Sequence, residues 1–335
     1  MKVLITGGCG FIGSNFIRYL LKEVGLNEDI SVVNLDKQTY AGIGKNLEHM
    51  GVENNKRYKF VRGDICNREL VESIFIEEKP DFVFNFAAES HVDRSINNSF
   101  PFVNTNVFGA LNLLEVCRRY RTKRFIQVGT DEVYGSLNSD DKSSKESDTL
   151  KPRSPYAASK AAADLIALSH YYTCNLPVIV TRSSNNYGFY QYPEKIIPLF
   201  ITNLIKGKKV PLMWSEENPG LNIRDWLHVH DNCRAIWFIA NQGKIGEIYN
   251  IPGENERKNI EVTKIILKEF GYGEEMIEKI PHRLGHDFRY SINGEKLKKL
   301  GFEHKHKNFE NELKKVCEWY KNNQNWWRAL KNDFS

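Results

Sequence analysis

The sequence lacks the features that mark several protein classes. Its six cysteines stand far apart, with no C-x-x-C pair and no histidine cluster at metal-ligand spacing, so we expect neither a metal nor a disulfide framework. No apolar run approaches the roughly 20 residues that a membrane helix needs, and we expect no membrane association. The N-terminus shows no charged segment followed by an apolar stretch and a cleavage site, so a cytoplasmic protein is expected.

The sequence also has little excess of charge of either sign. The formal net charge is only +5 over 335 residues, and Lys and Arg are spread along the chain rather than gathered in a basic run. Nucleic-acid-binding proteins usually carry such a run or patch, so we expect no nucleic-acid partner. The hydrophobic content of 41% is enough to bury a sizeable core.

Short apolar runs alternate with helix-length segments through the first half of the chain. The runs are Val3–Thr6, Ser31–Leu35, Lys59–Val61, Phe82–Phe86, Phe125–Gly129 and Val178–Thr181. Strands that are apolar on both faces are typical of a parallel sheet covered by helices on both sides. The pattern therefore predicts an α/β, doubly wound Rossmann-type fold.

The pattern becomes less regular after about Gly188, where several prolines interrupt it. We expect residues 1–188 to form mainly the parallel-sheet domain with the catalytic residues. Residues 189–335 are expected to form mainly a smaller C-terminal α/β domain that binds the substrate. The boundary is soft, because Val178–Thr181 and Glu247–Ile251 are expected to return to the main sheet.

A glycine-rich turn follows the first predicted strand. Gly8, Gly10 and Gly13 form G-x-G-x-x-G, and Gly7 with Gly10 and Gly13 gives the wider spacing. Such a turn lets the backbone approach a pyrophosphate at the helix N-terminus. Asp36 ends the second strand 23 residues after Gly13, where a carboxylate accepts both ribose hydroxyls and repels a 2′-phosphate. The combination favours NAD over NADP.

Two further patterns carry acid and base groups. Tyr156 and Lys160 are four residues apart in an Ala-rich segment of strong helix propensity, so they share one helix face. A Lys ammonium beside a phenol is expected to lower a pKa that is otherwise about 10. Thr130-Asp131-Glu132 directly follows an apolar strand, where ligands bind in open α/β sheets. Two solvated acids opening a loop would give the same pattern.

Together these residues resemble the extended short-chain dehydrogenase/reductase family, and within it the nucleotide-sugar 4,6-dehydratases. The resemblance covers roughly the first nine-tenths of the chain. It rests on the segments LDKQTYAG, GDIC, AAESHVDRSI, GTDEVYG, SPYAASKAAAD, SNNYG, YPEKIIPL, IRDWLHV, GEIYNI and GHDFRY, which stand in the family's order.

The resemblance implies a redox-neutral dehydration of dTDP-glucose. Tyr156 would deprotonate the C4 hydroxyl while NAD takes hydride from C4, and Lys160 would tune Tyr156 and hold the nicotinamide ribose. Thr130 would bond near the C4 oxygen. Glu132 would remove the C5 proton and Asp131 would protonate the departing C6 hydroxyl. The scheme needs a neutral Asp131 and an ionised Glu132 at the start.

The resemblance also implies two sets of binding residues. Those expected to bind the cofactor are Gly7, Gly10, Phe11, Ile12, Gly13, Asp36, Lys37, Thr39, Asp64, Ile65, Ala87, Ala88, Ser90, Thr105, Tyr156, Lys160 and Asn186. Those expected to bind the nucleotide sugar are Ser90, Thr130, Asn185, Lys195, Ile196, Pro211, Met213, Arg224, Asn259, His286 and Tyr290. Cationic Lys195 and Arg224 suit a diphosphate.

Three departures from the family pattern leave alternatives open. Phe189 stands where a proline is usual, Met213–Leu221 is longer than the usual turn, and His282 and Leu284 stand where Asp and Pro are typical. The last two fall where the family holds the nucleotide. UDP-glucose or a UDP-N-acetylated sugar is therefore an alternative substrate, and a nucleotide-sugar epimerase or decarboxylase is an alternative enzyme class. A regulatory NAD-binding protein would not need the full acid and base set.

The family pairs its subunits through two long helices. Val103–Arg119 and Tyr156–Tyr172 are the corresponding segments, so the resemblance implies a homodimer. The aromatic residues of Trp319–Trp327 stand at helical spacing, which indicates core or interface packing rather than chemistry.

Overall fold

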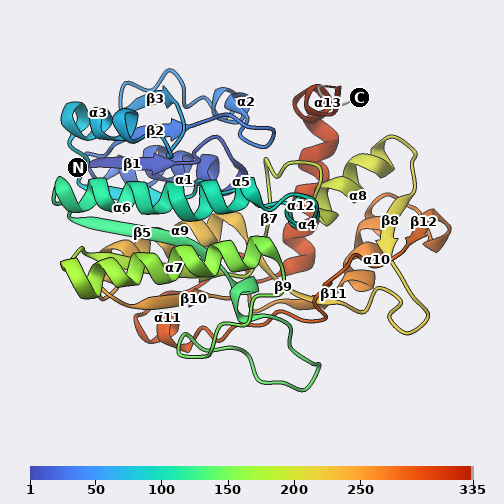
Figure 1. Cartoon of the computed structure of the whole chain (residues 1–335). Helices are drawn as coiled ribbons and strands as arrows, with labels where there is room; N and C mark the ends of the chain where they lie inside the picture. Colours follow the sequence, from blue (N-terminus) through green and yellow to red (C-terminus); the bar gives the residue numbers. More distant parts are fainter. Residues whose placement is uncertain (333–335) are drawn as a thin grey trace.

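A seven-stranded parallel sheet organises the computed structural model, which describes residues 1–332 (Figure 1). The strand order is β10-β6-β5-β4-β1-β2-β3, and every pairing is parallel. The strands are β1 (Lys2–Thr6), β2 (Ser31–Asp36), β3 (Tyr58–Arg62), β4 (Phe82–Asn85), β5 (Arg124–Thr130), β6 (Val178–Ser183) and β10 (Ile248–Ile251). The predicted doubly wound fold is confirmed, and the strand order reverses between β1 and β4.

Helices cover both faces of this sheet, and alternate strand residues pack against each layer. On one face, Val3 and Ile5 pack with α1 (Phe11–Lys22) and α9 (Val229–Gln242). On the other, Leu4 packs with α3 (Arg68–Glu78), α6 (Ala110–Arg119) and α7 (Pro155–Cys174). The strands are apolar on both sides because both sides are buried.

Shorter elements connect this framework. They are η1 (Val24–Leu26), α2 (Gly44–His49), α4 (Val92–Asn97), α5 (Phe100–Phe102), the π-helix η2 (Val103–Gly109), the 3-10 turn η3 (Asp131–Tyr134), η4 (Glu274–Met276) and α11 (Glu295–Lys299). The predicted helix Val103–Arg119 is thus a π-helix followed by α6, and Tyr156–Tyr172 lies within α7.

The rest of the chain forms a smaller layer beside the carboxyl ends of the main strands (Figure 1). It contains a sheet β11-β9-β7 and a parallel pair β12-β8. The elements are β7 (Asn185–Tyr187), α8 (Ile196–Ile205), β8 (Val210–Met213), β9 (Ile223–His228), β11 (Glu256–Lys258), α10 (Asn259–Glu269), β12 (Ile277–Ile280), α12 (Phe309–Asn322) and α13 (Gln324–Asn332). Trp326 and Trp327 are buried in this layer's core, as their spacing predicts.

The chain passes between the two layers more than once. β10 pairs with β6 in the main sheet, where the apolar run Glu247–Ile251 predicts it. Helix α9 also packs on the main sheet, against α1, which the sequence did not indicate. Within residues 1–332 no helix combines the length and the apolar character needed to cross a membrane.

Candidate active site

A cavity of about 630 Å³ lies at the carboxyl ends of the main strands, beside the smaller layer. Its walls come from the β1–α1 turn, the ends of β2, β4, β5 and β6, the start of α7, and several segments of the smaller layer. Every residue that the sequence assigned to the cofactor, the substrate or catalysis lines this one cavity. Such a position is the usual binding place in open α/β sheets.

The glycine turn between β1 and α1 forms one wall. Gly7 has φ 70°, and a Cβ there would stand 2.6 Å from the backbone nitrogen of Ala87. A Cβ on Gly13 would stand 2.3 Å from the carbonyl oxygen of Gly7. No side chain of the described residues caps the helix at Gly10, and the first turn contains no acid. The first-turn N–H groups are therefore free to bind an anion.

Asp36 stands at the end of β2 and is almost fully buried. Its two carboxylate oxygens accept hydrogen bonds from the backbone N–H groups of Cys9, at 2.8 Å, and Gln38, at 2.6 Å. Burial raises the pKa of Asp36, and these two hydrogen bonds oppose the rise. Each oxygen keeps a second acceptor site, so the carboxylate can still accept ribose hydroxyls. Nearby, Lys37 and Asp64 form an ion pair with each other at 2.7 Å.

Thr130, Asp131 and Glu132 lie where β5 ends in the short turn η3. The Thr130 hydroxyl accepts the N–H of Glu132 and donates to Oδ1 of Asp131, both at 3.3 Å. Asp131 is only 3% exposed, and its Oδ2 has no hydrogen-bond partner among residues 1–332. A buried carboxyl oxygen of this kind favours the protonated acid.

The two neighbouring carboxyls have different electrostatic surroundings. Burial, then Glu132 and Asp225, raise the pKa of Asp131 well above its usual value. Burial also raises the pKa of Glu132, but Arg283, Lys195 and Arg224 oppose that rise. Glu132 is therefore the carboxyl that ionises first, and Asp131 is the one that keeps its proton.

Tyr156 and Lys160 lie on the first turns of α7, whose N-terminus is capped by Ser154 and begins with Pro155. The Lys160 ammonium donates to the carbonyl oxygen of Val128 at 2.6 Å, and burial lowers its pKa. Burial, and then the carboxylate of Glu132, raise the pKa of Tyr156, while a hydrogen bond with Thr130 lowers it. The expectation that Lys160 lowers the pKa of Tyr156 is not met here, because burial raises it and Lys160 is not among the main causes of the shift.

The substrate wall is built from side chains of the smaller layer. Arg224 donates to the backbone carbonyls of Ile223, Phe288 and Asp287 and lies 4.4 Å from the ring centre of Tyr290. The Tyr290 hydroxyl donates to Asp287 at 2.5 Å and lies 3.5 Å from Glu132. Lys195 donates to the carbonyl of Ser90 at 3.2 Å, which joins the two sides of the cavity.

The structure adds one cation that the sequence did not single out. Arg283 lines the cavity, is the first cation to oppose the rise in the pKa of Glu132, and lies 3.6 Å from Asp93. Its Nε is buried without a partner in the described part of the chain. The signal was an arginine inside HRLGHD, a segment recognised only for its departures from the family pattern.

Two of the departures from the family pattern, His282 and the long segment Met213–Leu221, are in contact. His282 Nε2 lies 3.0 Å from the carbonyl oxygen of Asn218 in the long segment Met213–Leu221, and its Nδ1 lies 2.9 Å from Nδ1 of His286. Burial, and then Arg224, lower the pKa of His286 to about 3. The third departure, Phe189, packs against Trp319 and His228, away from the cavity lining.

The fold and the cavity define an enzyme of the extended short-chain dehydrogenase/reductase class. The family model described as GDP-mannose 4,6 dehydratase matches residues 4–316. The dTDP-glucose 4,6-dehydratase of Streptomyces niveus is 45% identical over 334 residues, covering 99% of this chain and 96% of the relative.

Solved structures agree with this likeness over the whole fold. The dTDP-glucose 4,6-dehydratase of Bacillus anthracis, solved in complex with NAD, has a TM-score of 0.90 and 45% identity, covering 98% of this chain and 99% of that one. The enzyme DesIV of Streptomyces venezuelae, solved with NAD and TYD bound, has a TM-score of 0.93 and 43% identity, covering 98% and 100%. The chain belongs to the GDP-mannose 4,6 dehydratase family.

Proposed function

We propose that this chain is an NAD-dependent hydro-lyase that converts dTDP-glucose to dTDP-4-keto-6-deoxyglucose and water. The observation that carries the proposal is the neighbouring pair of buried Asp131 and half-buried Glu132 next to Tyr156. Both pKa values are raised, but after burial the main influences are three cations that oppose the rise for Glu132 and two carboxylates that add to it for Asp131. A dehydratase needs a base and an acid that act at two neighbouring carbon atoms of the substrate. Full-length relatives named dTDP-glucose 4,6-dehydratase support the choice of sugar nucleotide.

The cavity residues fit NAD. The uncapped first turn of α1 suits the pyrophosphate, and the glycines leave room that a Cβ would fill. Asp36 suits an unphosphorylated ribose. When bound, NAD supplies a positively charged ring that accepts a hydride from C4 of the sugar and gives it back to C6.

Tyr156 and Thr130 act at C4. Tyr156 is placed to accept the proton of the C4 hydroxyl, which leaves a ketone once the hydride is gone. Because burial raises the pKa of Tyr156, its phenolate would need the positive charge that bound NAD supplies beside it. Thr130 is hydrogen-bonded to Tyr156 and to Asp131. It therefore links Tyr156, which gains a proton from the C4 hydroxyl, with Asp131, which later gives up its own. Lys160 holds the end of β5 through Val128 and lies one helical turn from Tyr156.

Glu132 and Asp131 act at C5 and C6. The ketone at C4 acidifies the C5 proton, which the Glu132 carboxylate removes, while Asp131 protonates the C6 hydroxyl as its C–O bond breaks and water leaves. Glu132 returns its proton to C5 when the hydride reaches C6. The proton held by Tyr156 restores Asp131 through Thr130, so all groups end in their starting state.

The direct test uses purified protein with dTDP-glucose and, separately, UDP-glucose. We expect loss of one water by mass spectrometry, an alkaline absorbance from the 4-keto product, and no net NADH. Faster turnover of dTDP-glucose supports the proposed base, and faster turnover of UDP-glucose overturns it. Intact sugars in both incubations overturn dehydration of these substrates.

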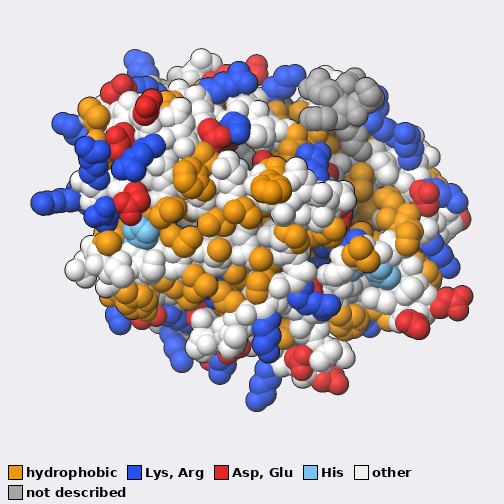
Figure 2. All heavy atoms as spheres, in the orientation of Figure 1, with side chains coloured by type: hydrophobic (Ala, Val, Ile, Leu, Met, Phe, Trp, Pro, Cys, Tyr) orange, Lys and Arg blue, Asp and Glu red, His pale blue; other side chains and the backbone are white. Residues whose placement is uncertain are grey.

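We also propose a homodimer built on α7 and the helical run from α5 to α6. Phe100 is 84% exposed and Tyr172 is 73% exposed, and Val103, Phe108 and Leu165 are exposed on the same elements. Figure 2 shows apolar side chains gathered across the face that carries α6 and α7. Sedimentation should give twice the chain mass, and Leu165→Glu should give monomers. A monomeric parent protein would contradict this dimer.

A cytoplasmic location is part of the same proposal. The six cysteines are free rather than paired, which is the usual state in a reducing compartment. Cell fractionation with antibody detection should place the protein with the cytoplasmic fraction, and recovery with the periplasm or medium would contradict it.

A further inference from the structure

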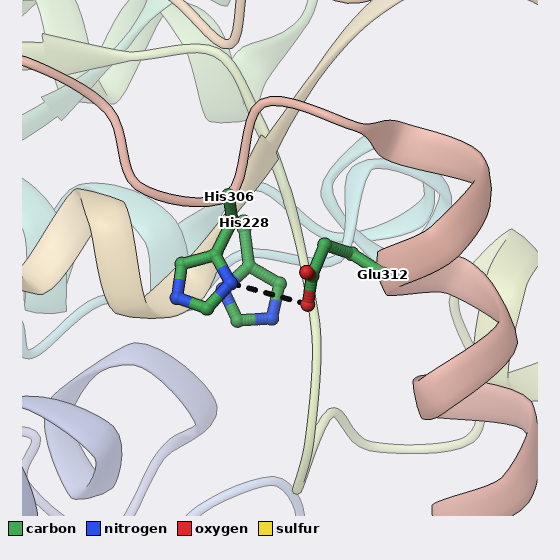
Figure 3. A group of neighbouring side chains, drawn as sticks. All are labelled: His228, His306 and Glu312. Atoms are coloured by element: carbon green, nitrogen blue, oxygen red, sulfur yellow. Dashed lines mark ion pairs between the residues drawn. The ribbon is translucent and has the colours of Figure 1, made fainter.

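A group of histidines lies outside the cavity, where α1, α9 and the segment before α12 meet. His230 is in the first turn of α9, and His306 lies three residues before α12. Glu23 caps the C-terminus of α1, and Glu312 is in the first turn of α12. Figure 3 shows the His306 ring beside His228, with one edge turned toward Glu312.

The outer nitrogen of each ring is bound to a carboxylate. His230 Nε2 lies 3.0 Å from both oxygens of Glu23, and His306 Nδ1 lies 3.1 Å from Oε2 of Glu312. Ionised carboxylates only accept hydrogen bonds, so these two nitrogens carry the ring protons. Metal-ligating histidines are usually oriented in this way, by a carboxylate on the nitrogen that does not bind the metal.

The inner nitrogens face each other. His230 Nδ1 and His306 Nε2 are 3.1 Å apart. A neutral imidazole carries one proton, which both rings already use on their carboxylates, so two lone pairs meet across this gap. Two imidazole nitrogens on a tetrahedral zinc, each about 2.0–2.1 Å from the ion, lie roughly 3.3 Å apart. The separation therefore suits a shared cation.

Neighbouring groups hold the two rings in place. The carboxylate of Asp231 accepts the N–H of Lys305 at 3.0 Å and of His306 at 2.7 Å, which ties the segment before α12 to α9. His228 stacks on His306 with ring centres 4.1 Å apart. One ligand atom from each of His230, Asp231 and His306 lies within 4.8 Å of the other two.

The charges around the rings balance. The three carboxylates Glu23, Asp231 and Glu312 contact, in that order, Arg18 at 3.6 Å, Arg234 at 2.7 Å and Lys315 at 2.8 Å. The cations therefore leave no net positive charge around the facing nitrogens, and a metal ion is not repelled.

We propose that His230 Nδ1 and His306 Nε2 bind one divalent transition-metal ion, with Asp231 close enough to give a third ligand and water completing the shell. Imidazole ligands suit Zn²⁺, Ni²⁺ and Cu²⁺. The ion joins α9 of the main layer to the chain that enters α12, and Glu23 at the end of α1 orients the His230 ring. These residues are not among those that line the cavity, so the site is structural rather than catalytic.

The binding test uses Zn²⁺ and full-length protein without a polyhistidine tag, stripped with a chelator. Calorimetry should show one equivalent of Zn²⁺ per chain, and His230→Gln or His306→Gln should weaken binding at least tenfold. His170→Gln is the matched control: His170 Nε2 also faces a glutamate, Glu115 at 3.0 Å, but its Nδ1 bonds to the carbonyl of Ile166 at 2.9 Å. The control should bind Zn²⁺ like the parent.

A second measurement needs no variant. X-ray absorption of the zinc-loaded parent should show nitrogen and oxygen ligands at about 2.0–2.1 Å with the scattering of two imidazoles. Parent protein that binds no more Zn²⁺ than the His230→Gln and His306→Gln variants would overturn the proposal. So would nitrogen NMR in the presence of Zn²⁺ that shows a proton, rather than the metal, between the two rings.

Discussion

The two sides of the cavity are built in different ways. The cofactor side consists mostly of backbone, with the glycine turn after β1, the uncapped start of α1 and the ends of regular strands. The substrate side consists of side chains such as Arg224, from strand β9, and Tyr290 and Arg283, from irregular segments of the smaller layer. A site made of backbone depends on fold and local spacing, whereas a site made of side chains depends on which distant segments meet.

The largest effect is expected where the two sides meet. Glu132→Gln removes the base that takes the C5 proton, so dehydration should fall by about 10²- to 10⁴-fold while NAD binding is unchanged. Steady-state kinetics measure the rate of dehydration, and titration of the protein fluorescence with NAD measures NAD binding. Full activity in this variant would contradict the role of Glu132, and lost NAD binding would show that the two sides are not independent.

The cofactor side is tested at Asp36. Asp36→Asn should weaken NAD binding by about 10- to 100-fold, the usual loss for hydrogen bonds to a charged group, and should narrow the preference for NAD over NADP. Binding of dTDP-glucose should stay unchanged, which calorimetry can check. Equal NAD affinity in the variant and the parent would remove Asp36 from the cofactor site.

The pH profile tests the division of roles between the two acids. Asp131 must be protonated, so activity should fall as pH rises through its raised pKa, and Glu132 must be ionised, so activity should fall as pH drops through its own raised pKa. Arg283→Gln removes a cation that opposes the rise for Glu132, so the acidic limb should move to higher pH. Arg257→Gln, outside the cavity lining, is the control and should leave the limb in place.

The smallest effect is expected at His282. This residue joins the long segment Met213–Leu221 to His286, so His282→Asn should raise KM for dTDP-glucose by a few fold with little change in kcat. The ratio of kcat/KM for dTDP-glucose and UDP-glucose measures its effect on the nucleotide base. A variant that lowers kcat and leaves KM unchanged would place His282 in the chemistry instead.

The same comparison explains what the sequence could predict. The main strands, the glycine turn, Asp36 and the acid and base residues follow from apolar runs and short spacings, and the glycine turn, Asp36 and the acid and base residues line the cavity. The return of α9 to the main sheet was missed, because an amphipathic helix does not indicate which surface it will cover. Arg283 was missed because its relation to Glu132 exists only after two segments about 150 residues apart have folded together.

The pKa shifts of the site residues could also be seen only in the folded structure. The sequence predicts that Lys160 lowers the pKa of Tyr156, but the ammonium donates to Val128 and the burial of both groups dominates. The expectation of no metal stays a prediction, and it rested on local spacing. The proposed site joins His230 and His306, which are 76 residues apart and meet only in three dimensions.

The most direct test of the dehydratase cycle follows one hydrogen atom. With dTDP-glucose carrying deuterium at C4, we expect a product that has lost one water and carries the deuterium at C6, with no accumulation of reduced NAD. Deuterium found in reduced NAD, or retained at C4 in a product of unchanged mass, would contradict the proposed reaction.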